Sequence, residues 1–415
     1  MAKVLWLGDA GCHTGFGRVT HAIGERLVDD YGHDVHVLAY NYRGDSWPSR
    51  NDPDRQTPLK LYRPNAVKGD DIFGLSRHIE LLAKIEPDVV VMLHDANMLL
   101  YLLFENTWDS EKLFVKYRPI ITYIPVDGYN RPPAWNVLTT ITNAVVMSKF
   151  GEESMPGSRL VYHGVDSDVF HPVSRKAPLT LSSGRIVYDS GDCKEAFGYP
   201  RDSFLIVRAD KNSGRKDFAS TIKAVWPVMK RHKDIRVHLH TTGGRSQNDA
   251  LVINDMLTRE PDVHERFSLP GLHNSFVGWP EEDLIALYNA ADLFVTTSRG
   301  EGFGLTIAEA MACGVPVIAQ NVSAIPEVVG PGGILLEPRN AVTVPNGSDL
   351  WMADVEAFTE AIEQLYNSRG ARRDLGQQAR EHIVSSFNWD FAAARFDEFI
   401  RALATAEPAA TAAAS

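Results

Sequence analysis

The sequence is poor in cysteine and has no long apolar run. Its three cysteines, Cys12, Cys193 and Cys313, are too few and too scattered for a disulfide framework or a cysteine-based zinc site. No stretch approaches the roughly 18–20 apolar residues of a membrane span. The first apolar run ends at Asp9 before a glycine-rich loop, which is typical of a strand and not of a signal peptide. These absences predict a cytoplasmic protein without stable membrane insertion.

Basic residues are also outnumbered, with 42 Lys and Arg against 53 Asp and Glu and a net charge of −11. This balance argues against a general polyanion binder. One stretch departs from it: residues 208–236 hold nine Lys and Arg against three Asp and Glu. A solvated helix face explains much of this stretch, but its first residues follow a candidate strand, Phe204–Val207, where a ligand is expected.

Short β-rich runs alternate with helical patterns along the 415 residues, which favours parallel sheets covered by helices. A first series runs from Val4–Leu7 to Arg159–Tyr162, and a second begins at Phe204–Val207 after a polar stretch that reads as a linker or surface loop. We therefore expect an α/β protein with two doubly wound Rossmann-like domains, residues 1–170 and 171–387, facing an interdomain cleft. An aromatic-rich helix is predicted at 388–403 and a disordered tail at 404–415.

The most informative stretch is 296–319, where a buried strand runs into a glycine loop and then a helix that begins near Leu305. Gly302 and Gly304 allow the backbone to approach a ligand, and free N–H groups at the helix start can hold phosphate. Glu301 precedes the helix, and Glu309 lies about one turn inside it. As an isolated pair these glutamates could be capping or surface residues, but the whole stretch favours a site for a nucleotide sugar.

The spacing of Glu301 and Glu309, followed by Ala-Met-Ala-Cys-Gly-Val-Pro-Val-Ile-Ala, resembles the signature of retaining GT-B glycosyltransferases of family 4, the glycosyl transferases group 1. Further matches are Phe276-Val277-Gly278-Trp279 and His163-Gly164-Val165-Asp166. The resemblance implies a GT-B fold whose last helix crosses back to the N-terminal domain. It also implies a hexosyltransferase that moves a sugar from a nucleotide diphosphate sugar, such as a UDP-sugar or GDP-sugar, to an acceptor hydroxyl with retention.

The resemblance also implies roles for individual residues. Glu301 would bind hydroxyls of the donor sugar, helped by backbone at Phe303, Gly304 and Leu305, and Glu309 would hold the ribose. An Arg and a Lys would stabilise the departing diphosphate, which develops negative charge in the transition state. The candidates for these two cations are Arg208, Lys211, Arg215 and Lys216. The family's usual spacing of five fits Lys211 and Lys216, with Lys where Arg is typical; we favour Lys216, with Arg208 ahead of Lys211 as its partner.

Three features of the first half are further candidates. Gly15 and Gly17 follow the first strand and could contact the donor or only turn the chain. His94 follows the strand Val89–Leu93 and could contact donor sugar or acceptor, or be structural. Asp127 follows the strand at 120–124 and could accept a proton or hydrogen bond from the acceptor hydroxyl, or form a turn. Segment 41–71 could be an acceptor loop or a surface insertion.

The sequence shows no metal-ligand constellation, so we expect catalysis without a metal or other cofactor. Two alternatives remain: a glycoside phosphorylase or synthase on the same fold, and a non-catalytic nucleotide-sugar-binding protein. An NAD-dependent dehydrogenase is disfavoured because the loop at 14–18 lacks the third glycine of the dinucleotide pattern. The acceptor, which could be a glycan, lipid, protein, small metabolite or modified nucleic acid, cannot be read from the motifs, and neither can the donor base, the linkage or the oligomeric state.

Overall fold

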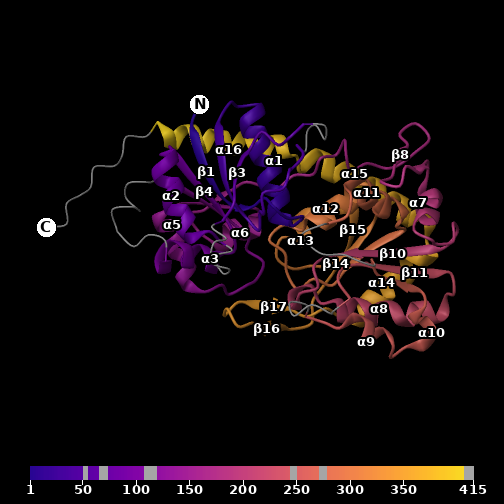
Figure 1. Cartoon of the computed structure of the whole chain (residues 1–415). Coiled ribbons are helices and arrows are strands. Elements are labelled where there is room, and N and C mark those ends of the chain that lie inside the picture. The colour runs from indigo at the N-terminus through magenta and orange to yellow at the C-terminus, as the bar shows by residue number, and fades with distance from the viewer. Residues whose placement is uncertain (50–54, 65–72, 107–118, 244–249, 271–277, 406–415) are drawn as a thin grey trace. The chain divides into compact units, whose positions relative to one another are not determined.

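The structure is a computed structural model that describes residues 1–49, 55–64, 73–106, 119–243, 250–270 and 278–405. It divides into two compact units (Figure 1). The N-terminal unit comprises Met1–Val126, Pro133–Gly164 and Trp389–Ser415, and the C-terminal unit comprises Asp127–Pro132 and Val165–Asn388. The chain therefore changes unit four times, at residues 127, 133, 165 and 389, and the short segment 127–132 belongs to the C-terminal unit.

The N-terminal unit is built on a parallel sheet of seven strands in the order β3-β2-β1-β4-β5-β6-β7. Consecutive strands run outward from β1 in both directions, so the unit is doubly wound, as predicted. The strands are β1 (Lys3–Asp9), β2 (Asp34–Tyr40), β3 (Lys60–Tyr62), β4 (Val89–Leu93), β5 (Ile120–Ile124), β6 (Asn143–Val146) and β7 (Arg159–Leu160). Every residue of β4 and β5 is buried, as expected of central strands in a sheet covered on both faces.

The helices of this unit are α1 (Gly15–Asp29), α2 (Leu75–Ile85), α3 (Ala96–Tyr101), α5 (Asn136–Ile141), α6 (Lys149–Ser154) and α16 (Trp389–Ala404). A π-helical turn, η1 (Leu102–Asn106), follows α3, and a 3-10 turn, η2 (Pro133–Trp135), precedes α5. In α1, Val19, Ile23 and Leu27 recur at helical spacing and are fully buried, while Thr14 caps its first turn. This fixes the start of α1 directly beyond the carboxyl end of β1.

Helix α16 joins the N-terminal unit although it comes from the end of the chain. It packs beside α1 (Figure 1). The Phe396 ring lies 5.7 Å from that of Trp6 on β1 and 5.1 Å from that of Tyr123 on β5. His33 and Asp397 add a buried polar contact, with Nε2 and Oδ1 2.7 Å apart. The aromatic side chains of this helix thus complete the core of the first sheet.

The C-terminal unit is built on a second parallel sheet, ordered β12-β11-β10-β13-β14-β15. It too is doubly wound, with the reversal between β10 and β13. The strands are β10 (Phe204–Ala209), β11 (Ile235–His240), β12 (Phe267–Ser268), β13 (Leu293–Thr296), β14 (Val317–Gln320) and β15 (Gly333–Leu336). The hairpins β8 (Leu179–Thr180) with β9 (Ile186–Val187) and β16 (Ala341–Thr343) with β17 (Asp349–Trp351) lie outside this sheet.

The helices of the C-terminal unit alternate with its strands. They are α7 (Ser190–Ala196), α8 (Phe218–Arg231), α9 (Ile253–Leu257), α10 (Pro261–His264), α11 (Glu281–Ala290), α12 (Leu305–Ala312), α13 (Ile325–Val329), α14 (Val355–Asn367) and α15 (Arg369–Ser386), with 3-10 turns η3 (Gly214–Lys216) and η4 (Gly330–Gly332). The core of this unit gathers residues of β10, β11, α8 and α14, including Phe218, Val237 and Phe358.

Two sequence predictions need correction. The polar stretch after residue 172, read as a linker, contains the β8–β9 hairpin and the start of α7, because Leu181 and Val187 are buried and Asp189 caps the helix. The interval 41–71 contributes β3, which extends the first sheet beside β2 through Lys60–Tyr62. Phe276 and Val277, quoted above for the resemblance, and the tail from residue 406 lie outside the described residues.

Candidate active site

The C-terminal unit brings two separate stretches of sequence to one edge of its sheet. The strand order reverses between β10 and β13, and open α/β sheets bind ligands outside the carboxyl ends of their strands at such a reversal. Strand β10 leads into Asp210 and the turn η3, and β13 leads into the glycine loop with Glu301. The basic stretch and the glutamate motif are therefore neighbours in the structure.

Three basic and three acidic side chains form what we call the charge cluster: Asp127, Arg208, Asp210, Arg215, Lys216 and Glu301. At its centre, Lys216 Nζ lies 2.7 Å from Glu301 Oε1, and Arg215 Nη1 lies 2.9 Å from Glu301 Oε2. Lys216 Nζ also lies 2.5 Å from Asp210 Oδ1. Arg215 extends the cluster through Nε, which lies 2.8 Å from Asp127 Oδ2.

The cluster fixes the protonation of its members. Burial alone would raise the pKa of Glu301, but Arg215 and Lys216 outweigh it and lower that pKa to about 2. The Arg215 guanidinium is affected in the opposite sense: burial opposes its charge, yet Glu301 and Asp127 raise its pKa well above the ordinary value. Glu301 is thus a carboxylate at neutral pH. It can accept hydrogen bonds from hydroxyl groups, and it has no proton to donate as a general acid.

Arg208 differs from the other cations because it is completely buried in β10. Its Nη1 donates to Thr297 Oγ1 at 2.9 Å and to Thr221 Oγ1, and its Nη2 donates to the carbonyl of Lys216. The guanidinium also lies over the Phe218 ring, 4.3 Å from its centroid. These contacts hold the turn that carries Lys216. The structure thus pairs Arg215 and Lys216 with Glu301, buries Arg208 against the backbone of Lys216, and leaves Lys211 exposed.

The glycine loop and α12 form the second half of the site. Helix α12 begins at Leu305, as predicted, after Gly304, whose φ of 106° lies in the left-handed region that favours glycine. Gly302 and Phe303 are buried beside it. Glu309, within α12, is also buried, and its Oε2 accepts a hydrogen bond of 3.0 Å from the Tyr288 hydroxyl. The loop therefore presents backbone N–H groups at a helix start between two carboxylates.

In the N-terminal unit the corresponding reversal lies between β1 and β4. Thr14 Oγ1 accepts from the N–H of Gly17 at 3.1 Å and donates to Asp9 Oδ2 at 2.9 Å, which ties the start of α1 to the end of β1. A Cβ at Gly17 would lie 2.4 Å from the Cys12 carbonyl oxygen, so this position requires glycine. Gly15 is the first residue of the helix.

His94 follows β4 at the same edge of the sheet. Its ring lies among Phe16, Tyr40 and Phe73, with ring centroids 5.6, 6.1 and 5.8 Å away. Nδ1 accepts the N–H of Asp95 at 2.8 Å, so the neutral ring carries its proton on Nε2. Burial lowers the pKa of His94 despite Asp95 and Asp9. The ring is therefore a neutral hydrogen-bond donor at physiological pH.

Comparisons with known proteins bear on the family and the fold. Residues 203–368 match the family model for glycosyl transferases group 1. The chain is 56% identical over 61 residues to the O-antigen chain mannosyltransferase B of Escherichia coli, covering 15% of this chain and 16% of that one. It is 30% identical over 181 residues to the D-inositol 3-phosphate glycosyltransferase of Corynebacterium aurimucosum, covering 42% and 38%. Residues 203–368 of the chain thus resemble the group 1 glycosyl transferases.

The fold comparison extends over nearly the whole of this chain. The structure of HepE from Anabaena, solved with UDP and glucose, superposes with a TM-score of 0.66 at 16% identity, covering 97% of this chain and 100% of that one. This likeness establishes the predicted GT-B fold. The chain spans only about one sixth and two fifths of the length of the two curated relatives above.

Sequence reasoning missed three polar residues that contact the basic stretch and the two glutamates of the motif. Asp210 bridges Lys216 and Arg208, Tyr288 donates to Glu309, and Ser323 Oγ accepts the N–H of Glu301 at 2.8 Å. Asp210 had a detectable signal, because it directly follows the strand β10. Tyr288 and Ser323 had no such signal in the sequence, because a tyrosine in a helix and a serine in a loop are common in any fold.

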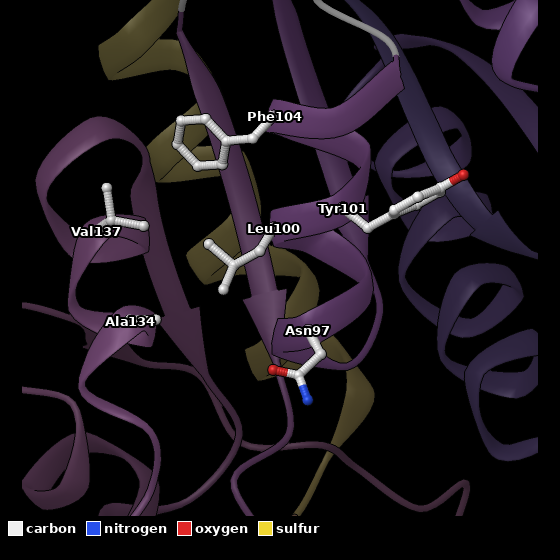
Figure 2. A pocket seen from close by; sticks show the side chains of 6 residues that line it. All are labelled: Asn97, Leu100, Tyr101, Phe104, Ala134 and Val137. Carbon is white, nitrogen blue, oxygen red and sulfur yellow. The ribbon is translucent and has the colours of Figure 1, made fainter. Parts of the chain in front are cut away.

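A hollow of about 440 Å³ lies in the N-terminal unit (Figure 2). Asn97, Leu100 and Phe104, from α3 and η1, face Ala134 and Val137. The lining is mostly apolar, and the amide Oδ1 of Asn97 accepts from Trp135 Nε1 at 2.8 Å. None of the site residues predicted from the sequence lines this hollow.

Within the described ranges, no group of three or more His, Cys, Asp or Glu side chains is arranged to hold a metal ion. The helices described there also include none that is long and apolar enough to cross a membrane.

Proposed function

We propose that this chain is a retaining glycosyltransferase that moves a hexosyl group from a nucleotide diphosphate sugar to an acceptor hydroxyl. The observation that carries the proposal is the placement of Lys216 and Arg215 within 2.7 and 2.9 Å of Glu301, at the reversal of the second sheet. A carboxylate that binds sugar hydroxyls beside two cations that bind phosphate matches the two sides of a sugar–diphosphate bond.

The chemistry follows from the charge that develops when this bond breaks. The bond from the anomeric carbon to the β-phosphate oxygen breaks, and negative charge accumulates on the diphosphate. Lys216 and Arg215 are fixed cations that would stabilise this charge, as Mg²⁺ does in metal-dependent transferases, so we propose that no metal is required. The bond to the acceptor oxygen forms on the same face of the sugar, and the acceptor proton passes to the departing phosphate.

Two further features support the donor assignment. Glu309 is held by Tyr288 about one turn into α12, where its carboxylate can bind a ribose hydroxyl while the N–H groups at the helix start hold phosphate. In the N-terminal unit, His94 offers a neutral N–H donor at the carboxyl end of β4. We propose that it binds a hydroxyl group of the donor sugar or of the acceptor. The structure of HepE contains UDP and glucose, so UDP-sugars are the first donors to test.

The test is slow hydrolysis of donors by the purified protein with excess EDTA. UDP-, GDP- and ADP-sugars are screened for release of nucleotide, and NMR gives the anomeric configuration of the transfer product. Glu301→Ala and Lys216→Ala should each lose most of the turnover while remaining folded. Lys223→Ala, which removes an exposed lysine from α8, is the control and should keep wild-type rates.

Three outcomes would contradict the proposal. Wild-type rates in Glu301→Ala and Lys216→Ala would remove the assigned roles. Formation of sugar 1-phosphate from a glycoside and inorganic phosphate, with no nucleotide sugar present, would identify a phosphorylase. Donor binding without any hydrolysis or transfer would identify a binding protein.

A further inference from the structure

The segment 127–132 is unusual because it leaves one unit of the fold to lie on the other. It follows β5 of the N-terminal unit and leads back into η2 of the same unit, yet its residues pack in the C-terminal unit. Tyr129 pairs with Asp349 of β17 through two backbone hydrogen bonds of 2.9 and 2.8 Å. Asn130 Nδ2 donates to Asp349 Oδ2 at 2.7 Å. These bonds hold the segment within the C-terminal unit.

The segment 127–132 also contacts the glycine loop that carries Glu301, at two places. A Cβ on Gly300 would lie 1.8 Å from the carbonyl oxygen of Asp127, so the two backbones touch without room for a side chain. On the other side, the Tyr129 hydroxyl accepts from the N–H of Ser323, whose Oγ accepts from the N–H of Glu301. These contacts place the side chain of Asp127 beside Arg215, with Asp127 Oδ2 2.8 Å from Arg215 Nε.

The charge cluster has three carboxylates and three cations, so its formal charge is zero. A nucleoside diphosphate brings at least two negative charges, and Arg215 can pair with it fully only if a carboxylate gives up its share of the guanidinium. Arg215 is bonded through Nε to Asp127 and through Nη1 to Glu301 and the Gly300 carbonyl. A diphosphate that takes Nε or Nη1 of Arg215 would therefore compete with one of these two carboxylates.

Burial indicates which carboxylate exchanges. The side chain of Asp127 is 31% exposed, whereas those of Glu301 and Asp210 are 7% and 4% exposed. A carboxylate that already contacts water loses little when it leaves its partner, but a buried one would be left uncompensated.

We propose that Asp127 is the exchangeable counter-ion of Arg215: it positions the guanidinium beside Glu301 and competes with the donor's diphosphate for it. This inference rests on the proposed function, because it takes the diphosphate of a nucleotide sugar as the competing anion. It replaces the idea that Asp127 accepts the proton of the acceptor hydroxyl. Asp127 is then a positioning residue that sets the affinity for the donor.

The test measures binding of UDP and GDP to the full chain by calorimetry. Asp127→Asn should lower the Kd of whichever nucleotide binds to wild type by about 2- to 5-fold. This is the range expected for loss of a partly exposed competing ion pair. The gain should shrink at about 0.5 M salt, which screens partly exposed charges. In Arg215→Gln, which should itself weaken binding, adding Asp127→Asn should give no further gain.

Asp349→Asn is the matched control, because it removes one negative charge from the site that anchors the same segment without touching Arg215. It should change nucleotide affinity less than Asp127→Asn does. Asp127→Ala serves as a second variant if the asparagine variant does not fold. In donor hydrolysis, the fall in KM should exceed any change in kcat.

The outcomes separate the two claims. Binding that is unchanged or weaker in both Asp127 variants, an equal gain in Asp349→Asn, or a full gain in the Arg215→Gln background would overturn this inference and leave the proposed function standing. A fall in kcat of about 100-fold at constant KM would make Asp127 a proton acceptor and would also overturn it. Failure of wild type to bind either nucleotide would overturn both.

Discussion

Gly300→Ala tests whether the 127–132 segment and the Glu301 loop are in contact. The added Cβ would lie 1.8 Å from the Asp127 carbonyl oxygen and 3.0 Å from its carbonyl carbon. Carbon and oxygen atoms that are not bonded approach to about 3.3 Å, so the two backbones would have to separate by about 1.5 Å. The φ angle of Gly300 lies outside the left-handed region, and the cost is therefore steric and not conformational.

Two effects follow from this displacement. Overpacking of a tight contact costs about 1–3 kcal/mol, and each kcal/mol lowers the Tm by about 2–4 °C in a unit of this size. The Gly300 carbonyl accepts from Arg215, and the next residue is Glu301, so the displacement also moves the charge cluster. A misplacement of about 1 Å in a catalytic site can cost about 100-fold in rate. We expect kcat/KM to fall by about that factor.

Donor hydrolysis and thermal unfolding measure the two effects in the same preparation. Gly370→Ala is the control: Gly370 is exposed at the start of α15, and no atom lies within 4 Å of the Cβ it would gain. Alanine there should keep the rate and equal or raise the Tm, because alanine favours helix over glycine. Wild-type rate and Tm in Gly300→Ala would refute the contact and the reasoning built on it.

Four further predictions concern single side chains. The pKa of Glu301 is lowered from 4.5 to about 2, so its ion pairs stabilise the fold fully above about pH 4.5 and lose that effect toward pH 2. In urea unfolding, Glu301→Gln should therefore lower the free energy of unfolding by at most about 3 kcal/mol at pH 7, and by less at pH 3. Tyr288→Phe removes the 3.0 Å bond to Glu309 and should raise the donor KM about 5-fold in steady-state hydrolysis, with a smaller change in kcat. Burial lowers the pKa of His94 from 6.5, so any acid limb of the pH–rate profile that disappears in His94→Asn should lie below pH 6.5. Thr14→Val removes the N-cap of α1 and should cost about 1 kcal/mol, seen as a lower Tm.

The parts of the fold that are local in sequence could be predicted. Helix α12 begins at Leu305, as the glycine loop before it indicates. The two doubly wound sheets follow from the alternation of short buried strands with helical patterns. The first sheet also has β3, which sequence could not predict because Lys60–Tyr62 is only three residues long and half-exposed, with no periodicity to detect.

The candidate site could be predicted where its residues follow strands directly. Lys216 and Glu301 lie in the stretches after β10 and β13, and parallel strands bring their carboxyl ends to one edge. The partner of Lys216 was harder to choose, because spacing alone does not tell which side chain of β10 points inward. Arg208 belongs to a strand whose residues are all buried, and its guanidinium is taken up by threonines and a backbone carbonyl. Arg215, on an irregular turn, is the one that reaches Glu301.

Asp127 shows where reasoning from sequence ends. Its position after β5 correctly predicts an aspartate at the carboxyl end of a strand in the first sheet. Its neighbours are set by contacts far apart in the chain: Tyr129 with residue 349, and Asp127 with residues 215 and 300. Each contact is ordinary by itself and has no local signature. Together they decide whether the carboxylate faces an acceptor or a guanidinium, and so whether it would act on a proton or on the affinity for a diphosphate.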